Sequence, residues 1–325
     1  MSSDRLSRFG RRELSLGALA GLAAPALAQG SRQVQVVVPF PPGGALDAVA
    51  RLIAQRVAES SGDTLIVENR PGANGNIGSR AVAQARPDGG TWLINSDGIA
   101  TVNPTLYPRQ MGFDPERNLQ VVATIGAMPS ILVVNPHTPW RSLAEFVAHA
   151  RGTEVSYASG GVGSAGHLTM EYFGSVARLK LSHVPYRGGA PAMTDLIAGQ
   201  VPVAFVAIGN AIDHVRSGAL RALAVSSPER LATVPEAPTV GESGFPGFDV
   251  VTAFLAWVPA GTPAELASRI SRQIRSALAD PAVQSRIRSF GIDPMDRPPE
   301  EAARWLSEER RKWAALIAER GITAD

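Results

Sequence analysis

The sequence predicts an α/β protein built from two units of similar size. Short apolar runs alternate with amphipathic stretches from residue 33 to about residue 93, and the same alternation begins again after residue 142. Strands separated by helices pair in parallel through right-handed crossovers, so each series predicts a mostly parallel sheet flanked by helices. The C-terminal segment carries further amphipathic helices, which we expect to complete the first unit.

The first unit begins with a buried strand at residues 34–38. An amphipathic helix follows over residues 45–59, with Val49, Leu52, Ile53 and Val57 on one face. We then expect a strand at 63–69, a helix at 76–85 and a strand at 90–95. Residues 102–118 are rich in Asn and Pro and are predicted to form a loop.

The second unit is predicted to begin after two strands at residues 120–125 and 131–134. Ser142 and Glu145 form a capping box at the start of a helix. Further strands are expected at residues 154–159, 180–186, 201–208 and 221–226, with helices at 164–177 and 190–199. Near the C-terminus, Thr262 is predicted to cap a helix that starts at Pro263, and a last amphipathic helix ends at Gly321.

Residues 1–28 are predicted to be a signal peptide. Four arginines between Arg5 and Arg12 precede an apolar stretch that starts at Leu14, and Ala26-Leu27-Ala28 forms a cleavage site. We therefore expect export to the periplasm with cleavage after Ala28. An uncleaved anchor is the alternative, and the arginine pair leaves both the general secretory route and the twin-arginine route open.

Composition narrows the chemistry of the exported part. Apolar residues make up 45% of the chain and charged residues 18%, and no cysteine occurs. The absence of cysteine excludes a lipoprotein anchor, a disulfide framework and a thiol nucleophile. The chain has 31 basic and 29 acidic residues, of which 27 basic and 27 acidic residues remain without the leader. The formal net charge of this part is therefore zero, so neither nucleic acid nor an anionic membrane surface is an expected partner. No cofactor and no metal are expected, and the protein is predicted to be a monomer.

Three turns between a strand and a helix are rich in glycine, at residues 39–46, 159–166 and 186–190. Ligands of open α/β sheets bind at such turns, where free amides and the helix dipole favour an anion. Two turns that face each other across a cleft would hold a small carboxylate. The alternative is that each turn merely ends a strand.

The sequence contains little that indicates an enzyme. Gly161-Val-Gly-Ser-Ala-Gly166 fits a dinucleotide fingerprint, but no acidic residue follows at the distance that would hold a ribose. The five histidines lack metal-binding spacing, and no G-x-S-x-G motif occurs. An exported hydrolase or lyase that uses Asp47 and His167 is the remaining enzymatic alternative. Structural roles compete with it, because Asp47 would compensate the helix dipole and His167 would bond the glycine loop.

The motifs "VPFPPGGALDAVAR", "VENRPGANGNIGSRAVAQARPDGGTWL", "YASGGVGSAGHLTMEYF", "HVPYRGGAPAMTDLIAGQV", "LRALAVSSPER" and "VPAGTP" occur in this order. With them the chain resembles the Bug-type (TctC-like) periplasmic solute receptors of tripartite tricarboxylate transporters. The resemblance implies a two-lobed periplasmic-binding-protein fold with the ligand cleft between the lobes. Lobe 1 would comprise residues 29–129 and 253–325, and lobe 2 would comprise residues 130–252, with a hinge near 129–131 and 250–254.

The resemblance also implies a function and a set of binding residues. The protein would capture a small carboxylate-bearing solute and deliver it to membrane permease subunits. The alternative is an exported receptor that signals without a permease. Carried over by motif, the ligand-binding residues are Phe40, Gly43, Gly44 and Asp47 in lobe 1 and Ser159, Gly161, Gly163, Ser164 and His167 in lobe 2, with Ser96 and Asp97 at the edge of the cleft. Leu46 departs from the family, which usually has Ser or Thr before the helix aspartate, so the ligand is expected to be held differently there.

Overall fold

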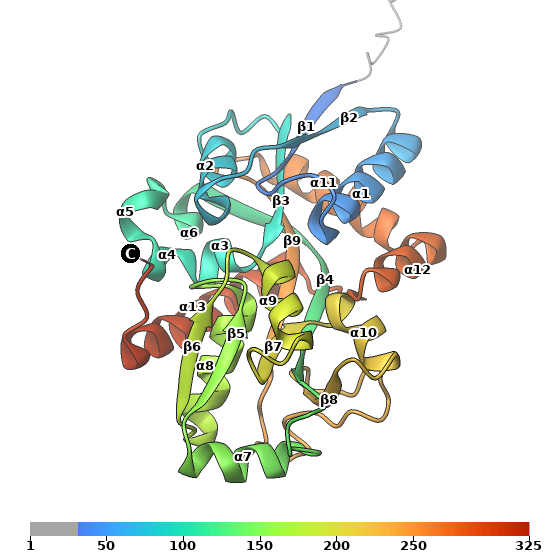
Figure 1. The fold of residues 1–325 in the computed structure, drawn as a ribbon. Helices are drawn as coiled ribbons and strands as arrows, with labels where there is room; N and C mark the ends of the chain where they lie inside the picture. The colour runs from blue at the N-terminus through green and yellow to red at the C-terminus, as the bar shows by residue number, and fades with distance from the viewer. Residues whose placement is uncertain (1–31, 325) are drawn as a thin grey trace, which may run out of the picture.

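A computed structural model describes residues 32–324, so the predicted signal peptide lies outside the described residues. The chain folds into two α/β lobes, which Figure 1 shows one above the other. The strand β4 (Leu119–Val134) runs from one lobe into the other and belongs to the sheets of both. The connected strand order is β2-β1-β3-β9-β4-β7-β5-β6, with β8 and β10 paired to β4.

The first lobe has a mixed sheet. The strands β1 (Gln33–Val38), β2 (Thr64–Asn69) and β3 (Thr91–Ser96) are parallel, and β9 (Val251–Pro259) runs antiparallel between β3 and β4. The short strand β10 (Asp293–Pro294) pairs with β4. The sheet is flanked by α1 (Ala45–Ser61), α2 (Asn76–Ala83), α11 (Ala264–Leu278) and α12 (Pro281–Ser289). The central strands are buried on both sides, which explains why their sequences are nearly continuous apolar runs.

The second lobe repeats this arrangement on a smaller scale. The strands β5 (Val155–Ser159), β6 (Leu181–Pro185) and β7 (Val203–Ala207) are parallel, while β7 and β8 (Arg221–Val225) pair antiparallel to β4. The helices of this lobe are α7 (Leu143–Gly152), α8 (Ala165–Ala177), α9 (Gly189–Ile197) and α10 (Ile208–Arg216). The predicted parallel pairing holds for β1, β2 and β3 and for β5, β6 and β7, whereas the pairs that β4 and β9 form are antiparallel, so each sheet is mixed.

Three local predictions were wrong. Residues 120–125 and 131–134 belong to the single strand β4, because Pro129 pairs at the end of the β9 ladder without ending the strand. The predicted loop at 102–118 contains one-turn helices, α4 (Asn103–Leu106), α5 (Pro108–Met111) and α6 (Pro115–Asn118), after the similar α3 (Gly98–Thr101). Thr262 does not cap α11, since its hydroxyl donates to the carbonyl of Pro259 and Pro263 takes the cap position.

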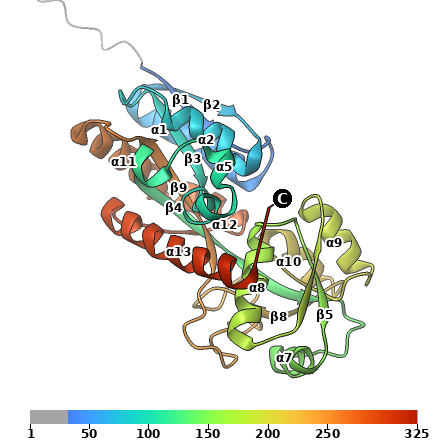
Figure 2. The ribbon, with the colours of Figure 1, turned by 90° about the vertical axis from the view of Figure 1, so that its left-hand side faces the viewer.

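The last helix, α13 (Pro299–Arg320), packs against both lobes. Ala302 and Leu306 are buried with the core of the first lobe, whereas Trp313, Leu316 and Ile317 are buried with the core of the second. Figure 2 shows α13 running from the first lobe to the side of α8. Its end at Gly321 is as predicted. The lobe boundaries that the sequence predicts stay a prediction.

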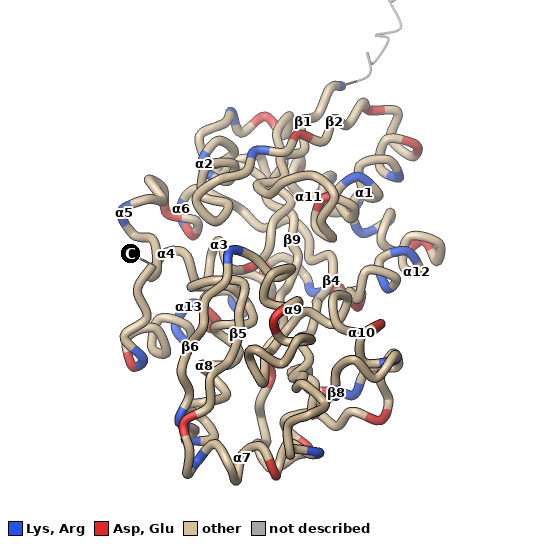
Figure 3. The backbone as a smooth tube through the Cα atoms, viewed as in Figure 1, with Lys and Arg blue, Asp and Glu red and all other residues tan. Residues whose placement is uncertain are grey.

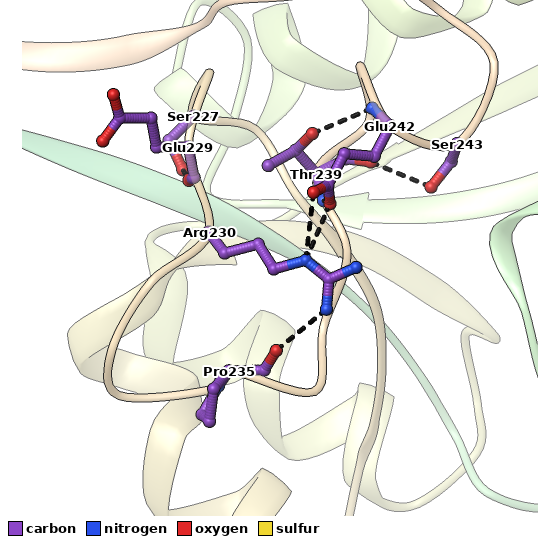
Figure 4. A network of polar contacts seen from close by, with 7 residues as sticks. All are labelled: Ser227, Glu229, Arg230, Pro235, Thr239, Glu242 and Ser243. Atoms are coloured by element: carbon purple, nitrogen blue, oxygen red, sulfur yellow. Dashed lines mark hydrogen bonds and ion pairs between the residues drawn. The ribbon is translucent and has the colours of Figure 1, made fainter.

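A long segment without helix or strand, residues 226–250, returns the chain from β8 to β9. Its own polar groups fix its shape (Figure 4). Arg230 donates to the carboxylate of Glu242 and to the carbonyl of Pro235, while Thr239 and Glu242 exchange two hydrogen bonds in the manner of a capping box. The arginine of the family-like motif "SSPER" thus closes a loop in this structure.

Acidic and basic residues are interspersed along the backbone of both lobes (Figure 3). Among the described residues, no helix is long and apolar enough to cross a membrane. The same residues contain no cluster of three or more acidic, histidine or cysteine side chains that could hold a metal ion.

Candidate functional site

A cavity of about 240 Å³ lies between the lobes. It is lined by Phe40, Asn74, Ser96, Asp97, Gly98, Ile99, Val102, Asn103, Ser130, Gly163, Ser164, Ala165, Leu168, Thr169, Val250, Val251, Thr252 and Trp313. A larger hollow of about 740 Å³ lies on the first lobe, between α6, α11 and α13. No predicted binding residue lines that hollow. We place the candidate site in the smaller cavity, which Phe40 of the first-lobe turn and Gly163 and Ser164 of the second-lobe turn line together.

The second lobe contributes the N-terminus of α8 to the cavity. Ser164 is the N-cap residue, and its hydroxyl accepts a hydrogen bond from the His167 amide. The amides of a first helical turn have no partner within the helix, and the dipole favours a negative charge there. Because Ser164 and Ala165 line the cavity, this helix end can receive a carboxylate.

Gly163 holds the turn before α8 against the first lobe. Its φ is +75°, and an added Cβ would lie 2.3 Å from Cδ2 of Leu106. The Tyr107 hydroxyl donates to the carbonyl of Val162 at 3.5 Å. Only glycine fits this close approach, which brings the two lobes together at one edge of the cavity.

His167 supports this turn from behind and does not line the cavity. Its Nδ1 accepts a hydrogen bond from the Gly163 amide at 3.1 Å, and its ring stacks on His183 with 3.9 Å between centroids. Burial, together with the charge that His183 would carry, lowers the pKa of His167 to about 3. His167 is therefore neutral at physiological pH, and the geometry favours its structural role over a catalytic one.

Ser159 and Gly161 also lie beside the cavity without lining it. The Ser159 hydroxyl accepts from the Gly161 amide, donates to the Gly161 carbonyl, and lies 2.6 Å from Nε2 of His183. The contact with His183 ties the end of β5 to β6, and the two bonds with Gly161 fix the start of the turn. Both residues shape the turn that leads to Gly163.

Asp47 supports the glycine turn of the first lobe. Its carboxylate accepts from the Gly43 amide, from Asn69 and from Arg51. Burial alone would raise the pKa of Asp47, but the hydrogen bonds from Arg51, Gly43 and Asn69 lower it. Asp47 therefore stays ionised and fixes the turn, as the structural alternative predicts.

The turn before α1 contributes one side chain to the cavity, and the backbone at its two glycines is not crowded by other atoms. Phe40 lines the cavity, while Cβ atoms added at Gly43 and Gly44 would meet nothing within 4 Å. Leu46 is buried in the core of the first lobe, so the position that departs from the family does not face the cavity.

Ser96 and Asp97, predicted at the edge of the cleft, both line the cavity. Asp97 is only 6% exposed, and its Oδ1 accepts from the Ala253 amide at 3.0 Å. Burial, with a smaller contribution from Glu309, raises the pKa of Asp97 to about 7. A carboxyl group that titrates near neutral pH thus faces the site.

The structure brings five of the predicted binding residues together around the cavity: Phe40, Ser96, Asp97, Gly163 and Ser164. The other six, Gly43, Gly44, Asp47, Ser159, Gly161 and His167, lie in or behind the turns. The contact of each with a ligand stays a prediction.

Sequence reasoning missed other lining residues, including Asn74, Asn103, Thr252 and Trp313. The Asn74 side-chain amide donates a hydrogen bond to the Asn103 side chain, and Asn74 has a φ of +50°. The "PGANG" motif was a signal for Asn74. No local signal marks Trp313, which reaches the cavity from the far end of the chain.

These features are those of a two-lobed solute-binding protein whose candidate site lies between the lobes. Residues 49–322 match the family described as "Tripartite tricarboxylate transporter family receptor", TctC. The chain belongs to this family, as the sequence motifs predict. Members of the family are periplasmic receptors and not enzymes, so the receptor prediction is confirmed and the hydrolase or lyase alternative is not supported.

Relatives match over nearly the whole chain. A Pseudomonas protein encoded in the tcbD-tcbE intergenic region is 37% identical over 98% of this chain and 97% of its own length. Protein BugT of Bordetella pertussis is 35% identical over 94% of each chain.

Solved structures support the fold. An R. palustris protein solved with adipate has a TM-score of 0.78 and 32% identity, covering 91% of this chain and 99% of its own. MatC from Rhodopseudomonas palustris, with bound malate, has a TM-score of 0.72 and 31% identity, covering 88% of this chain and 99% of its own. The predicted two-lobed periplasmic-binding-protein fold is confirmed.

Proposed function

We propose that this protein captures a small carboxylate-bearing solute in the periplasm and delivers it to the membrane subunits of a tripartite tricarboxylate-type transporter. The observation that carries the proposal is the cavity between the lobes, into which the N-terminus of α8 opens beside Gly163 and Ser164. Adipate and malate, the ligands named for two related structures, are both dicarboxylates.

The proposed binding mode relies on backbone amides and helix polarity. No lysine or arginine is among the residues that line the cavity in the described part of the chain. A carboxylate at the start of α8 would receive amide hydrogen bonds and the favourable field of the helix. Bridging waters would complete its coordination.

The experiment that tests the proposal is a ligand screen on the purified protein. Thermal unfolding is measured in the presence of dicarboxylates, tricarboxylates, aromatic acids and amino acids. A ligand at about one hundred times its dissociation constant stabilises the folded state by about 2.7 kcal/mol, which raises the melting temperature by several degrees. The absence of any shift across these classes would contradict the proposal.

The lobes are proposed to close on the ligand about a hinge near residues 129–131 and 250–254. Both segments connect the lobes, and Ser226 ties them together, because its hydroxyl accepts from the Ser130 amide and donates to the Val250 carbonyl. Small-angle scattering with a ligand from the screen would detect the compaction. An unchanged radius of gyration would contradict closure.

Export and delivery form the second part of the proposal. The predicted leader, cleaved after Ala28, would place the mature protein in the periplasm as a monomer. Mass spectrometry of the exported protein checks the cleavage, and size-exclusion chromatography with light scattering checks the monomer. A genetic test separates transport from signalling: deletion of the large membrane subunit abolishes ligand uptake if this protein serves a permease and leaves uptake intact if it serves only as a sensor.

A further inference from the structure

Asp97 is the charged residue of the cavity. Every other lining residue in the described part of the chain is apolar or neutral. Asp97 is 6% exposed, and its Oδ1 accepts a hydrogen bond from the Ala253 amide. The backbone amide of Asp97 also interacts with the carboxylate, whereas no side chain of the described residues donates to it. The cavity thus contains a largely buried carboxyl group that only backbone amides bind within the described residues.

The charged groups nearest Asp97 do not compensate it. Glu309 and Lys312, both on α13, act on its carboxylate only through space, with opposite signs. Lys312 donates to Glu309 at 2.7 Å and to the carbonyl of Asp249 at 3.4 Å, and it lies over the ring of Trp313. Its charge is therefore engaged by Glu309 on its own helix. No described cation lies within ion-pair distance of Asp97, and an unpaired buried carboxylate is unfavourable.

We infer that Asp97 selects ligands that carry an ammonium group as well as a carboxylate, so that this receptor prefers small amino acids or similar zwitterions to simple dicarboxylates. The inference rests on the proposed function, because it assigns a substrate class to the same cavity. The ligand carboxylate would bind at the N-terminus of α8. Its ammonium group would donate to the Asp97 carboxylate, which lines the opposite wall just after the end of β3.

Electrostatics separates the two ligand classes. A dicarboxylate in this cavity places its second negative charge near Asp97, which is tolerated only when Asp97 is protonated. An ammonium group instead forms a charge-assisted hydrogen bond with ionised Asp97 and removes its desolvation penalty. The same side chain therefore favours one class and disfavours the other.

The two classes have opposite pH dependence, because the pKa of Asp97 in the empty cavity is raised to about 7. Affinity for a zwitterion falls as the pH drops below 7, by at most about tenfold per pH unit, since a proton must leave Asp97 on binding. Affinity for a dicarboxylate that stays ionised rises as the pH falls from 8 to 6, since protonated Asp97 no longer repels it.

Isothermal titration calorimetry at pH 8 and pH 6 tests the inference. The probes are aspartate and succinate, which differ by the ammonium group, and 4-aminobutyrate, in which an aminomethyl group replaces one carboxylate of succinate. We expect aspartate or 4-aminobutyrate to bind at least tenfold more tightly than succinate at pH 8. In Asp97→Asn, this preference falls at least tenfold. Asp213→Asn, which removes the same charge from an exposed site on α10, keeps the wild-type preference.

The outcomes separate this inference from the proposed function. Tight succinate binding that is insensitive to pH and to Asp97→Asn overturns the role of Asp97 and leaves the carboxylate receptor intact. Failure of these probes and of every carboxylate in the thermal screen overturns both. If Asp97→Asn does not fold, the opposite pH trends of the two ligand classes in the wild-type protein decide the question.

Discussion

The Gly163 amide donates to Nδ1 of His167 at 3.1 Å, so a buried neutral imidazole holds the turn that closes one wall of the cavity. The amide is thereby satisfied within the protein and is not free for a ligand. His167 is a positioning residue, which acts on the site through the conformation of Gly163.

Replacement of His167 should weaken ligand binding without removing a direct contact. His167→Leu deletes the acceptor and leaves the buried Gly163 amide unpaired, which costs about 1–3 kcal/mol. We expect a roughly tenfold loss of affinity in calorimetry. His167→Asn keeps an acceptor near the position of Nδ1 and should retain most of the affinity. Equal losses in both variants would contradict the positioning role.

The same histidine should make the protein less stable in acid. Its pKa is about 3 in the folded state and 6.5 without the fold, so the unfolded chain binds the proton first as the pH falls. The free energy of unfolding should therefore decrease below pH 6.5, by up to about 1.4 kcal/mol per pH unit from this group. His183, whose pKa burial also lowers, adds to the slope. Urea unfolding at pH 7, 6 and 5 measures the slope, which should be smaller in His167→Leu.

The two glycine turns should respond differently to an added methyl group. Gly163→Ala places a Cβ 2.3 Å from Leu106 at a positive φ, and we expect a loss of about 1–3 kcal/mol in stability together with weaker binding. Gly44→Ala is the matched substitution in the other lobe, where the φ is −80° and the added atom meets nothing. Its cost should stay within about 1 kcal/mol. Similar melting temperatures for the two variants would contradict the close packing at Gly163.

Asp47 should stabilise the first turn at neutral pH. Asp47→Ala leaves the Gly43 amide, Arg51 and Asn69 without their shared acceptor, and we expect a loss of about 2 kcal/mol with reduced affinity. Because the folded-state pKa of Asp47 lies below 3.8, this contribution is present at neutral pH and is lost only as the pH falls through that lower value. Glu59→Ala, an exposed substitution at the other end of α1, should change stability by less than about 0.5 kcal/mol. An equal effect of the two substitutions in urea unfolding would contradict the role of Asp47.

Periodicity and turn chemistry predicted most of the fold. Most strands outside β4 are short, largely apolar runs, and this pattern located them in the sequence. The sequence also located the turns at Gly43 and Gly163. The one-turn helices at 98–118 were missed because asparagine and proline indicate a loop, whereas their position depends on tertiary packing against α13 and β4.

The remaining parts of the site depend on contacts between distant segments. Asp97 has its unusual environment because Ala253, more than 150 positions away, pairs with it and because α13 covers it. Trp313 reaches the cavity only because α13 crosses from one lobe to the other. Neither the Asp97–Ala253 contact nor the position of Trp313 can be predicted from hydrophobic periodicity or from the spacing of residues in the sequence.

The two tryptophans of α13 should therefore differ in their effects. Trp313 is 4% exposed, lies in the core of the second lobe and lines the cavity, so Trp313→Ala should cost about 3–5 kcal/mol and weaken binding. Trp305 is half-buried against the first lobe, with the Arg297 guanidinium 5.1 Å from its ring, and Trp305→Ala should cost less and leave binding unchanged. Urea unfolding and calorimetry on both variants check this order. If Trp305→Ala weakens ligand binding more than Trp313→Ala does, the result would contradict the role of Trp313 in the cavity.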